Sequence, residues 1–180
     1  LFRRLEKGVR AVVENGVAEL RSSDFQPLWF ELGFGYGPDK SLPPVNRTSH
    51  GITLSISGFV DRVDGWVKDD KFYLRVVDYK SGRKSFDLAS VRMGLDIQML
   101  LYLFALQKEG AQHFGHEIEP AGVLYLPARD EILSAERNIP PEKLRREREK
   151  QLRRSGLLLS DPEVLQAMEH ESLQEPHFLP

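Results

Sequence analysis

The sequence contains no cysteine, which excludes disulfide bonds and any zinc or iron–sulfur site held by cysteine within these 180 residues. It has no apolar run long enough for a transmembrane helix and no signal peptide, so we expect a soluble, cytoplasmic protein. It also has no G-x-x-x-x-G-K-[ST] motif, so ATP hydrolysis is not expected within it. Lys and Arg number 25 against 27 Asp and Glu, and this balance gives no global positive field for nucleic acid.

The length suits one domain, and hydrophobic periodicity predicts both helices and strands in it. Asp87 is placed to cap the long central helix, which Gly94 interrupts and Gly110 ends. The segment from 33 to 45 is rich in Gly and Pro and is expected to form a loop. The predicted helices are 1–20, 88–108, 142–154 and 162–169, and the predicted strands are 28–34, a half-buried 52–56, a hairpin of 63–68 and 71–77, and a buried 121–126.

Two acids and a lysine stand where apolar, strand-like runs end. Asp61 closes Gly58-Phe59-Val60-Asp61, and Asp78 and Lys80 close Val76-Val77-Asp78-Tyr79-Lys80. Residues two apart in a strand point to the same face, so Asp78 and Lys80 should project into one site. Carboxylates hold Mg²⁺ or Mn²⁺, and a lysine can position the attacking water or offset charge on a phosphate. The pattern therefore indicates metal-assisted phosphodiester hydrolysis.

Other interpretations of the same residues stay open. Surface strands often carry Asp and Lys, and Asp64 rivals Asp61 within the same motif. The five histidines have no i, i+4 spacing to one another and are expected at the surface. The basic and acidic run from Arg145 to Arg154 is either a solvated helix face or a contact to a phosphate backbone.

The three motifs in order carry a family resemblance. G-F-V-D at 58–61, D-Y-K-S-G at 78–82 and Gln98-x-x-x-Tyr102 resemble the RecB-like branch of the PD-(D/E)XK nuclease superfamily. The strings at 58–64, 94–98 and 120–130 are most similar to AddB, the B subunit of bacterial ATP-dependent helicase/deoxyribonucleases. The resemblance covers about residues 28–169. It implies an α/β, restriction-endonuclease-like fold with a central mixed β-sheet flanked by helices, a core at about 28–130 and a helical extension at about 137–170.

The resemblance also implies roles for individual residues. Asp61 and Asp78 would be metal ligands, with the Tyr79 backbone carbonyl as a third oxygen. Lys80, Gln98 and Tyr102 would be catalytic and would contact DNA, and Gln98 and Tyr102 share a helix face because they are four apart. Asp64 would be structural, paired with Arg62 or Arg75, and Glu31 has no assigned role. The metal-binding His of RecB-like nucleases has no counterpart in the first helix, whose acids are Glu6, Glu14 and Glu19, so we expect that histidine upstream of Leu1.

The implied function is that of a Mg²⁺- or Mn²⁺-dependent exonuclease domain acting on single-stranded DNA. It would be a piece of a larger bacterial protein that works with an AddA-like helicase–nuclease partner in recombinational repair of double-strand breaks. The full-length protein could carry an iron–sulfur cluster that these cysteine-free residues lack. The alternatives are a nuclease-fold module that binds DNA or a partner without cutting, and an unrelated protein in which D-Y-K is accidental.

Overall fold

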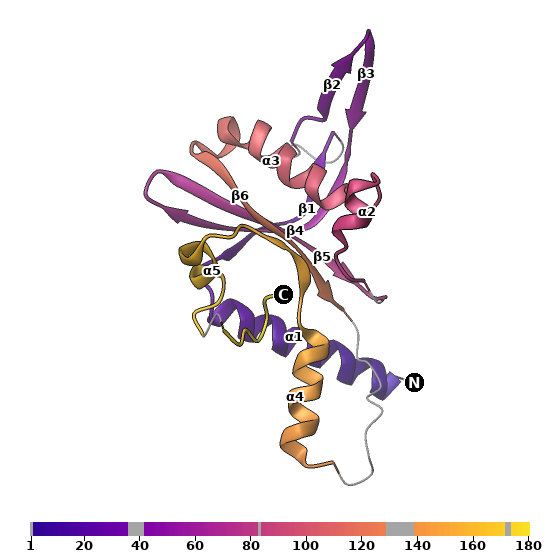
Figure 1. The fold of residues 1–180 in the computed structure, drawn as a ribbon, viewed down its shortest axis with the longest axis vertical. Helices are drawn as coiled ribbons and strands as arrows, with labels where there is room; N and C mark the ends of the chain where they lie inside the picture. Colours follow the sequence, from indigo (N-terminus) through magenta and orange to yellow (C-terminus); the bar gives the residue numbers. More distant parts are fainter. Residues whose placement is uncertain (1, 36–41, 83, 129–138, 172–173) are drawn as a thin grey trace. The chain divides into compact units, whose positions relative to one another are not determined.

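The computed structural model describes residues 2–35, 42–82, 84–128, 139–171 and 174–180 (Figure 1). The chain forms two compact units, which we call the hairpin unit (residues 25–78 and 87–123) and the terminal unit (residues 1–24, 79–86 and 124–180). Along the chain the elements are α1 (Phe2–Arg21), β1 (Gln26–Phe34), β2 (Val45–Ser49), β3 (Ile52–Ile56), β4 (Gly58–Lys68), β5 (Lys71–Lys80), α2 (Leu88–Arg92), α3 (Gln98–Phe114), β6 (Glu117–Pro127), α4 (Pro141–Leu152), β7 (Ser155–Leu158) and α5 (Pro162–Met168).

Five strands form a mixed central sheet in the order β1-β4-β5-β6-β7, and the remaining two form a separate hairpin. Strand β4 pairs antiparallel with both β1 and β5. With its flanking helices, this sheet confirms the predicted α/β class. The predicted division into a core at about 28–130 and an extension at about 137–170 stays a prediction. None of the described helices is both long and apolar enough to span a membrane.

Aromatic contacts hold α3 against β1 in the hairpin unit. Phe34 stacks on Tyr102 with ring centroids 5.6 Å apart, and Trp29 lies 4.4 Å from Phe114. Such pairs bury large apolar area with defined geometry, so they fix the position of α3 along the strand.

The helix predicted from 88 to 108, with an interruption at Gly94, is two separate helices, Leu88–Arg92 and Gln98–Phe114. Gly94 and Asp96 both have positive φ, 78° and 54°, and this left-handed backbone cannot continue a helix. The prediction that Gly110 ends the helix was wrong as well. Helix α3 runs on to Phe114 and ends at Gly115, whose φ of 72° suits a glycine cap. Asp87 caps α2 as predicted, and hydrogen bonds from Ser90 Oγ and two backbone amides hold the pKa of its carboxyl below the usual value.

The strand predicted as half-buried at 52–56 is exposed. It is β3, and it pairs with β2, which the sequence pattern did not predict, in a hairpin that projects from the rest of the hairpin unit (Figure 1). Ile52 and Leu54 are 74% and 62% exposed. Alternating apolar residues therefore mark the strand correctly, but they say nothing about whether a partner layer covers them.

Two strands differ from prediction near the end of the chain. Strand β6 begins at Glu117, four residues before the predicted apolar stretch, and its residues from Ala121 to Leu126 are buried as expected. Strand β7 was not predicted, because Ser155–Leu158 is short and follows directly on a charged helix.

Buried charge organises the terminal unit. Arg154 Nη2 donates to Glu19 Oε2 at 2.6 Å, and both side chains are almost fully buried. The Arg154 guanidinium also lies 5.2 Å from the centre of the Phe178 ring. Glu169 accepts hydrogen bonds from the backbone amides of residues 177–179, at 2.6 to 3.2 Å. These contacts tie α1 to the segment that follows α4, so Glu19 has a structural partner.

Candidate active site

Asp61 and Asp78 lie on neighbouring antiparallel strands, each directly beyond the last pair of the β4–β5 ladder. In the β4–β5 ladder Arg62 faces Val77 and Val63 faces Val76, and Asp61 and Asp78 are the next residues on the two strands. A single hairpin thus brings together two acids that lie 17 positions apart along the chain.

The donor set of this pair suits a hard divalent cation. Both acids are half-buried, and each comes directly after a buried apolar residue, Val60 or Val77. Two carboxylates held close together repel each other when no cation is bound. Mg²⁺ and Mn²⁺ prefer oxygen ligands such as these. Among the described residues, no group of three or more acids or histidines is close enough to hold a metal.

Asp64, the alternative to Asp61 as a metal ligand, is fully buried, and two arginines balance its charge. Its carboxylate lies 2.8 Å from Arg62 Nε and accepts hydrogen bonds from Arg62 Nη2 at 3.0 Å and from Arg75 Nε at 2.9 Å. The Arg75 guanidinium lies 5.2 Å from the centre of the Phe25 ring. The predicted pairing of Asp64 is therefore confirmed, with both arginines as partners. This network fixes β4 to β5 three residues from the Asp61–Asp78 pair.

Gln98 and Tyr102 bind each other at the start of α3. Gln98 Nε2 donates to Tyr102 Oη at 2.8 Å, while the Tyr102 ring is buried against Phe34. The Tyr102 hydroxyl also lies against Gly58, since a Cβ added to that glycine would be 2.2 Å from the oxygen. Gly58 thus allows α3 to approach the beginning of β4, three residues before Asp61.

Replacing Gly58 with alanine should destabilise the protein by about 1–3 kcal/mol, the usual cost of overpacking. The stacked Tyr102 ring has little room to retreat, so we expect its bond with Gln98 to break as well. Urea unfolding measures the change. Gly82→Ala is the matched control, because no atom of the described residues lies within 4 Å of a Cβ at that position. Equal stability of the two variants would contradict the close approach.

Glu31 lies on β1 with an unusual backbone conformation that the sequence pattern did not predict. Phe30 faces Arg62 and Leu32 faces Val60, so Glu31 lies at the level of Asp61 on β1. Its φ is 52°, a left-handed conformation that is costly for a non-glycine residue in a strand. Nothing in the sequence pattern distinguishes it from an ordinary strand acid.

Tyr79 and Lys80 belong to the terminal unit. The Lys80 carbonyl accepts a hydrogen bond from the Ala128 amide at 2.9 Å, and its ammonium lies 5.6 Å from the centre of the Tyr125 ring. Strand β5 carries both Lys80 and Asp78, two residues apart as predicted. Arg129 and Asp130, which end the third string of the resemblance, lie outside the described residues.

The charged run of α4 behaves as a solvated face. None of its residues is buried, and it carries ion pairs between Arg145 and Glu149 at 3.5 Å and between Lys150 and Glu147 at 3.0 Å. Arg154, beyond the helix, is the exception through its buried pair with Glu19.

Comparison with known proteins gives two findings. The profile of the PD-(D/E)XK nuclease superfamily matches residues 1–178. The chain is also similar to the B subunit of the ATP-dependent helicase/deoxyribonuclease of two clostridia, with 37% identity over 172 residues for Clostridium acetobutylicum and 38% over 172 residues for Clostridium novyi. The alignments cover 95% of this chain but only 14% and 15% of those relatives.

Proposed function

Because the chain belongs to the PD-(D/E)XK nuclease superfamily, we propose that it hydrolyses phosphodiester bonds of DNA at the Asp61–Asp78 pair. The observation that carries the proposal is the β4–β5 pairing, whose last pair, Arg62 and Val77, directly adjoins both acids. The superfamily generally uses divalent metals, and a pair of carboxylates is a suitable start for such a site.

The residues of this chain would divide the work as follows. Asp61 and Asp78 would hold the cation, and the Tyr79 carbonyl would add a neutral oxygen. When bound, Mg²⁺ or Mn²⁺ supplies a Lewis acid that lowers the pKa of water and offsets charge on the phosphate. Lys80 positions the attacking water and donates to the phosphate oxygens, where negative charge grows in the transition state.

Gln98 and Tyr102 act at the DNA side of the proposed site. The Gln98 amide is exposed, so it can donate its second N–H to a phosphate or a water while it keeps its bond to Tyr102. Tyr102 is buried and accepts the other Gln98 hydrogen bond, so its part is to orient the Gln98 amide. Gln98 and Tyr102 would thus act together to position the DNA strand.

The relatives suggest the setting of this activity. Their name, which is that of one subunit of an ATP-dependent helicase/deoxyribonuclease, describes a nuclease within a larger assembly. We extend this to the present chain as a domain that degrades single-stranded DNA exonucleolytically in the bacterial cytoplasm, with an AddA-like partner, during recombinational repair of double-strand breaks. A helicase would deliver the separated strand, which agrees with the net charge of −2.

Removal of divalent metal should abolish cleavage, and adding Mg²⁺ or Mn²⁺ back should restore it. The test follows end-labelled single-stranded and duplex oligonucleotides in EDTA, Mg²⁺, Mn²⁺ and Ca²⁺. We expect the single strand to be cut first, because duplex DNA must be opened before one strand can be threaded. Cleavage that persists in EDTA would refute the proposal. Binding of DNA and metal without any cleavage would favour the non-cutting module instead.

A further inference from the structure

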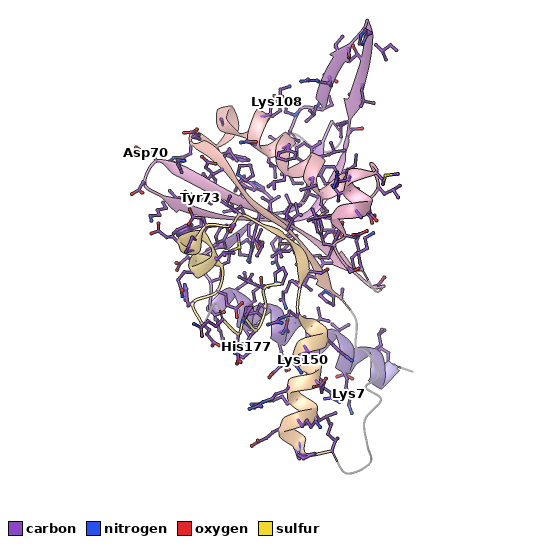
Figure 2. All side chains as sticks on the ribbon, viewed as in Figure 1. Lys7, Asp70, Tyr73, Lys108, Lys150 and His177 are labelled. Atoms are coloured by element: carbon purple, nitrogen blue, oxygen red, sulfur yellow. The ribbon has the colours of Figure 1, made fainter. Side chains whose placement is uncertain are left out.

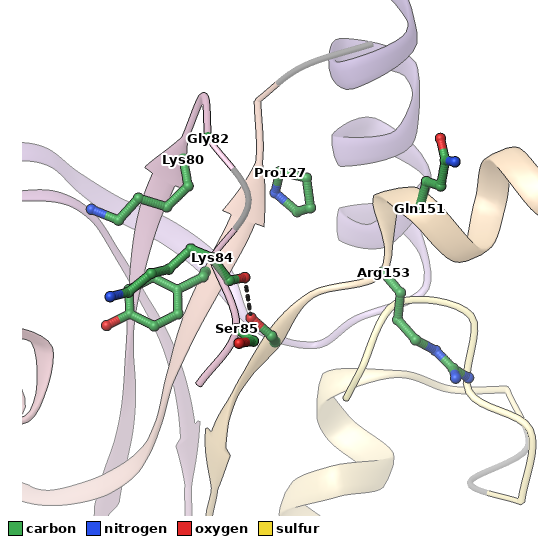
Figure 3. Close-up of a pocket in the computed structure, with 9 residues that line it drawn as sticks. Lys80, Gly82, Lys84, Ser85, Pro127, Gln151 and Arg153 are labelled. Atoms are coloured by element: carbon green, nitrogen blue, oxygen red, sulfur yellow. Dashed lines mark hydrogen bonds between the residues drawn. The ribbon is translucent and has the colours of Figure 1, made fainter. Parts of the chain in front are cut away.

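A pocket of about 320 Å³ opens in the terminal unit, beyond the end of β5 (Figure 3). Its wall is made by the loop after Lys80, by β6, by the end of α4 and by the start of β7. The volume lies at the lower end of the range of about 300–1,000 Å³ that pockets for small ligands span.

Two lysines share one aromatic ring in this pocket. Lys80 Nζ and Lys84 Nζ lie 5.6 and 5.9 Å from the centre of the Tyr125 ring. Both side chains extend in the same direction, on the other side of the pocket from Gln151 and Arg153 (Figure 3). The ring face attracts each ammonium, so it brings two cations together at one wall of the pocket.

The backbone beneath both lysines is anchored. Ser155 Oγ donates to the Lys84 carbonyl at 3.1 Å, and the Ala128 amide donates to the Lys80 carbonyl at 2.9 Å. Tyr125, the residue of β6 that both ammonium groups approach, is buried, with only 5% of its surface exposed. Groups whose supports are fixed in this way bind a ligand with less loss of conformational entropy.

The polar groups around the pocket suit a phosphate ester. Its described lining residues include three cations, Lys80, Lys84 and Arg153, and two hydroxyl groups, from Ser85 and Ser155, but no carboxylate. The whole chain carries a formal charge of −2, so this concentration of positive charge is local. Lysine and arginine bind phosphate oxygens, while serine hydroxyl groups add hydrogen bonds without sequence preference.

We propose that Lys84, with Lys80 and the Tyr125 ring, forms a second phosphate subsite that holds the backbone of single-stranded DNA. This inference rests on the proposed nuclease function, because Lys80 is shared between the subsite and the reacting phosphate. Lys84 binds substrate and takes no part in bond cleavage. Its removal should therefore weaken DNA binding and raise KM more than it lowers kcat.

The test measures binding of a fluorescent oligothymidylate by anisotropy in EDTA, across a range of salt concentrations. Lys84→Gln should weaken binding about three- to tenfold at low salt and reduce the slope of log K against log salt by about 0.7, the value for one phosphate contact on a single strand. Lys84→Arg should keep both the affinity and the salt slope near the wild-type values. Lys108→Gln is the matched control, since Lys108 is an exposed lysine of α3 paired with Glu109 (Figure 2). All variants should show unchanged unfolding in urea.

The outcomes separate this inference from the proposed function. If the wild type cuts DNA and Lys84→Gln binds like Lys108→Gln, the subsite is wrong and the nuclease stands. If the wild type binds but never cuts, and Lys84→Gln alone loses affinity and slope, the subsite stands and the nuclease proposal fails. A wild type that does not bind the oligothymidylate in EDTA overturns the subsite.

Discussion

Replacing Asp78 with asparagine should lower the rate of DNA cleavage about a thousandfold, equivalent to about 4 kcal/mol of transition-state stabilisation. Asparagine keeps the shape of the side chain but removes the charge that would hold a divalent cation together with Asp61. The rate is measured on labelled single-stranded DNA with saturating Mg²⁺. Binding of the same DNA in EDTA should be unchanged or slightly tighter, because one negative charge is lost.

Asp70→Asn is the matched control for this variant. Asp70 is an exposed acid in the turn of the same hairpin, and Figure 2 shows it at the tip, where β4 meets β5. Its replacement should leave the cleavage rate within about twofold, as expected for a surface site that contacts no substrate. Near wild-type cleavage by Asp78→Asn would remove Asp78 from the active site.

Replacing Asp64 with alanine should destabilise the protein by about 3–5 kcal/mol, the cost of leaving buried charge uncompensated. Arg62 and Arg75 both bind this carboxylate, and all three side chains are at most 4% exposed. Asp64→Asn should cost less, because its remaining oxygen can still accept from one arginine. The free energy of unfolding is measured in urea, with the slope of the transition checked for two-state behaviour.

The exposed Asp70 again provides the comparison, and Asp70→Ala should change the free energy of unfolding by less than about 0.5 kcal/mol. A loss of less than about 1 kcal/mol in Asp64→Ala would show that the two arginines find water or other partners in its absence. It would then contradict the structural role assigned to the network.

The strand pattern of the hairpin and the places of Asp61 and Asp78 could be predicted from the sequence, for a physical reason. Both acids end apolar runs whose two-residue period marks buried strands, and the Asp69-Asp70 turn joins the two strands in a register that runs up to the residues next to both acids. The same logic predicted that Asp64 would pair with an arginine. The sequence pattern is sufficient here because the two strands of this hairpin are neighbours along the chain and are joined by a short turn.

The remaining features depend on contacts between distant parts of the chain, which a local pattern cannot show. The pattern of Ile52 and Leu54 predicts a buried face, yet no described layer covers them in the structure. Gly94 predicted an interruption of the helix, but the full break also needs the positive φ of Asp96. The Lys84–Tyr125 contact joins residues 41 positions apart along the chain, so no local pattern could have indicated the pocket.

Titration of the protein with Mn²⁺, followed by calorimetry in the absence of DNA, tests most directly whether Asp61 and Asp78 form a metal site. We expect binding that is lost in the Asp61→Asn/Asp78→Asn double variant and kept in Asp70→Asn, with all three proteins equally folded. Mn²⁺ binding that is unchanged in the double variant would place the metal elsewhere and contradict the assignment of this acidic pair as the active site.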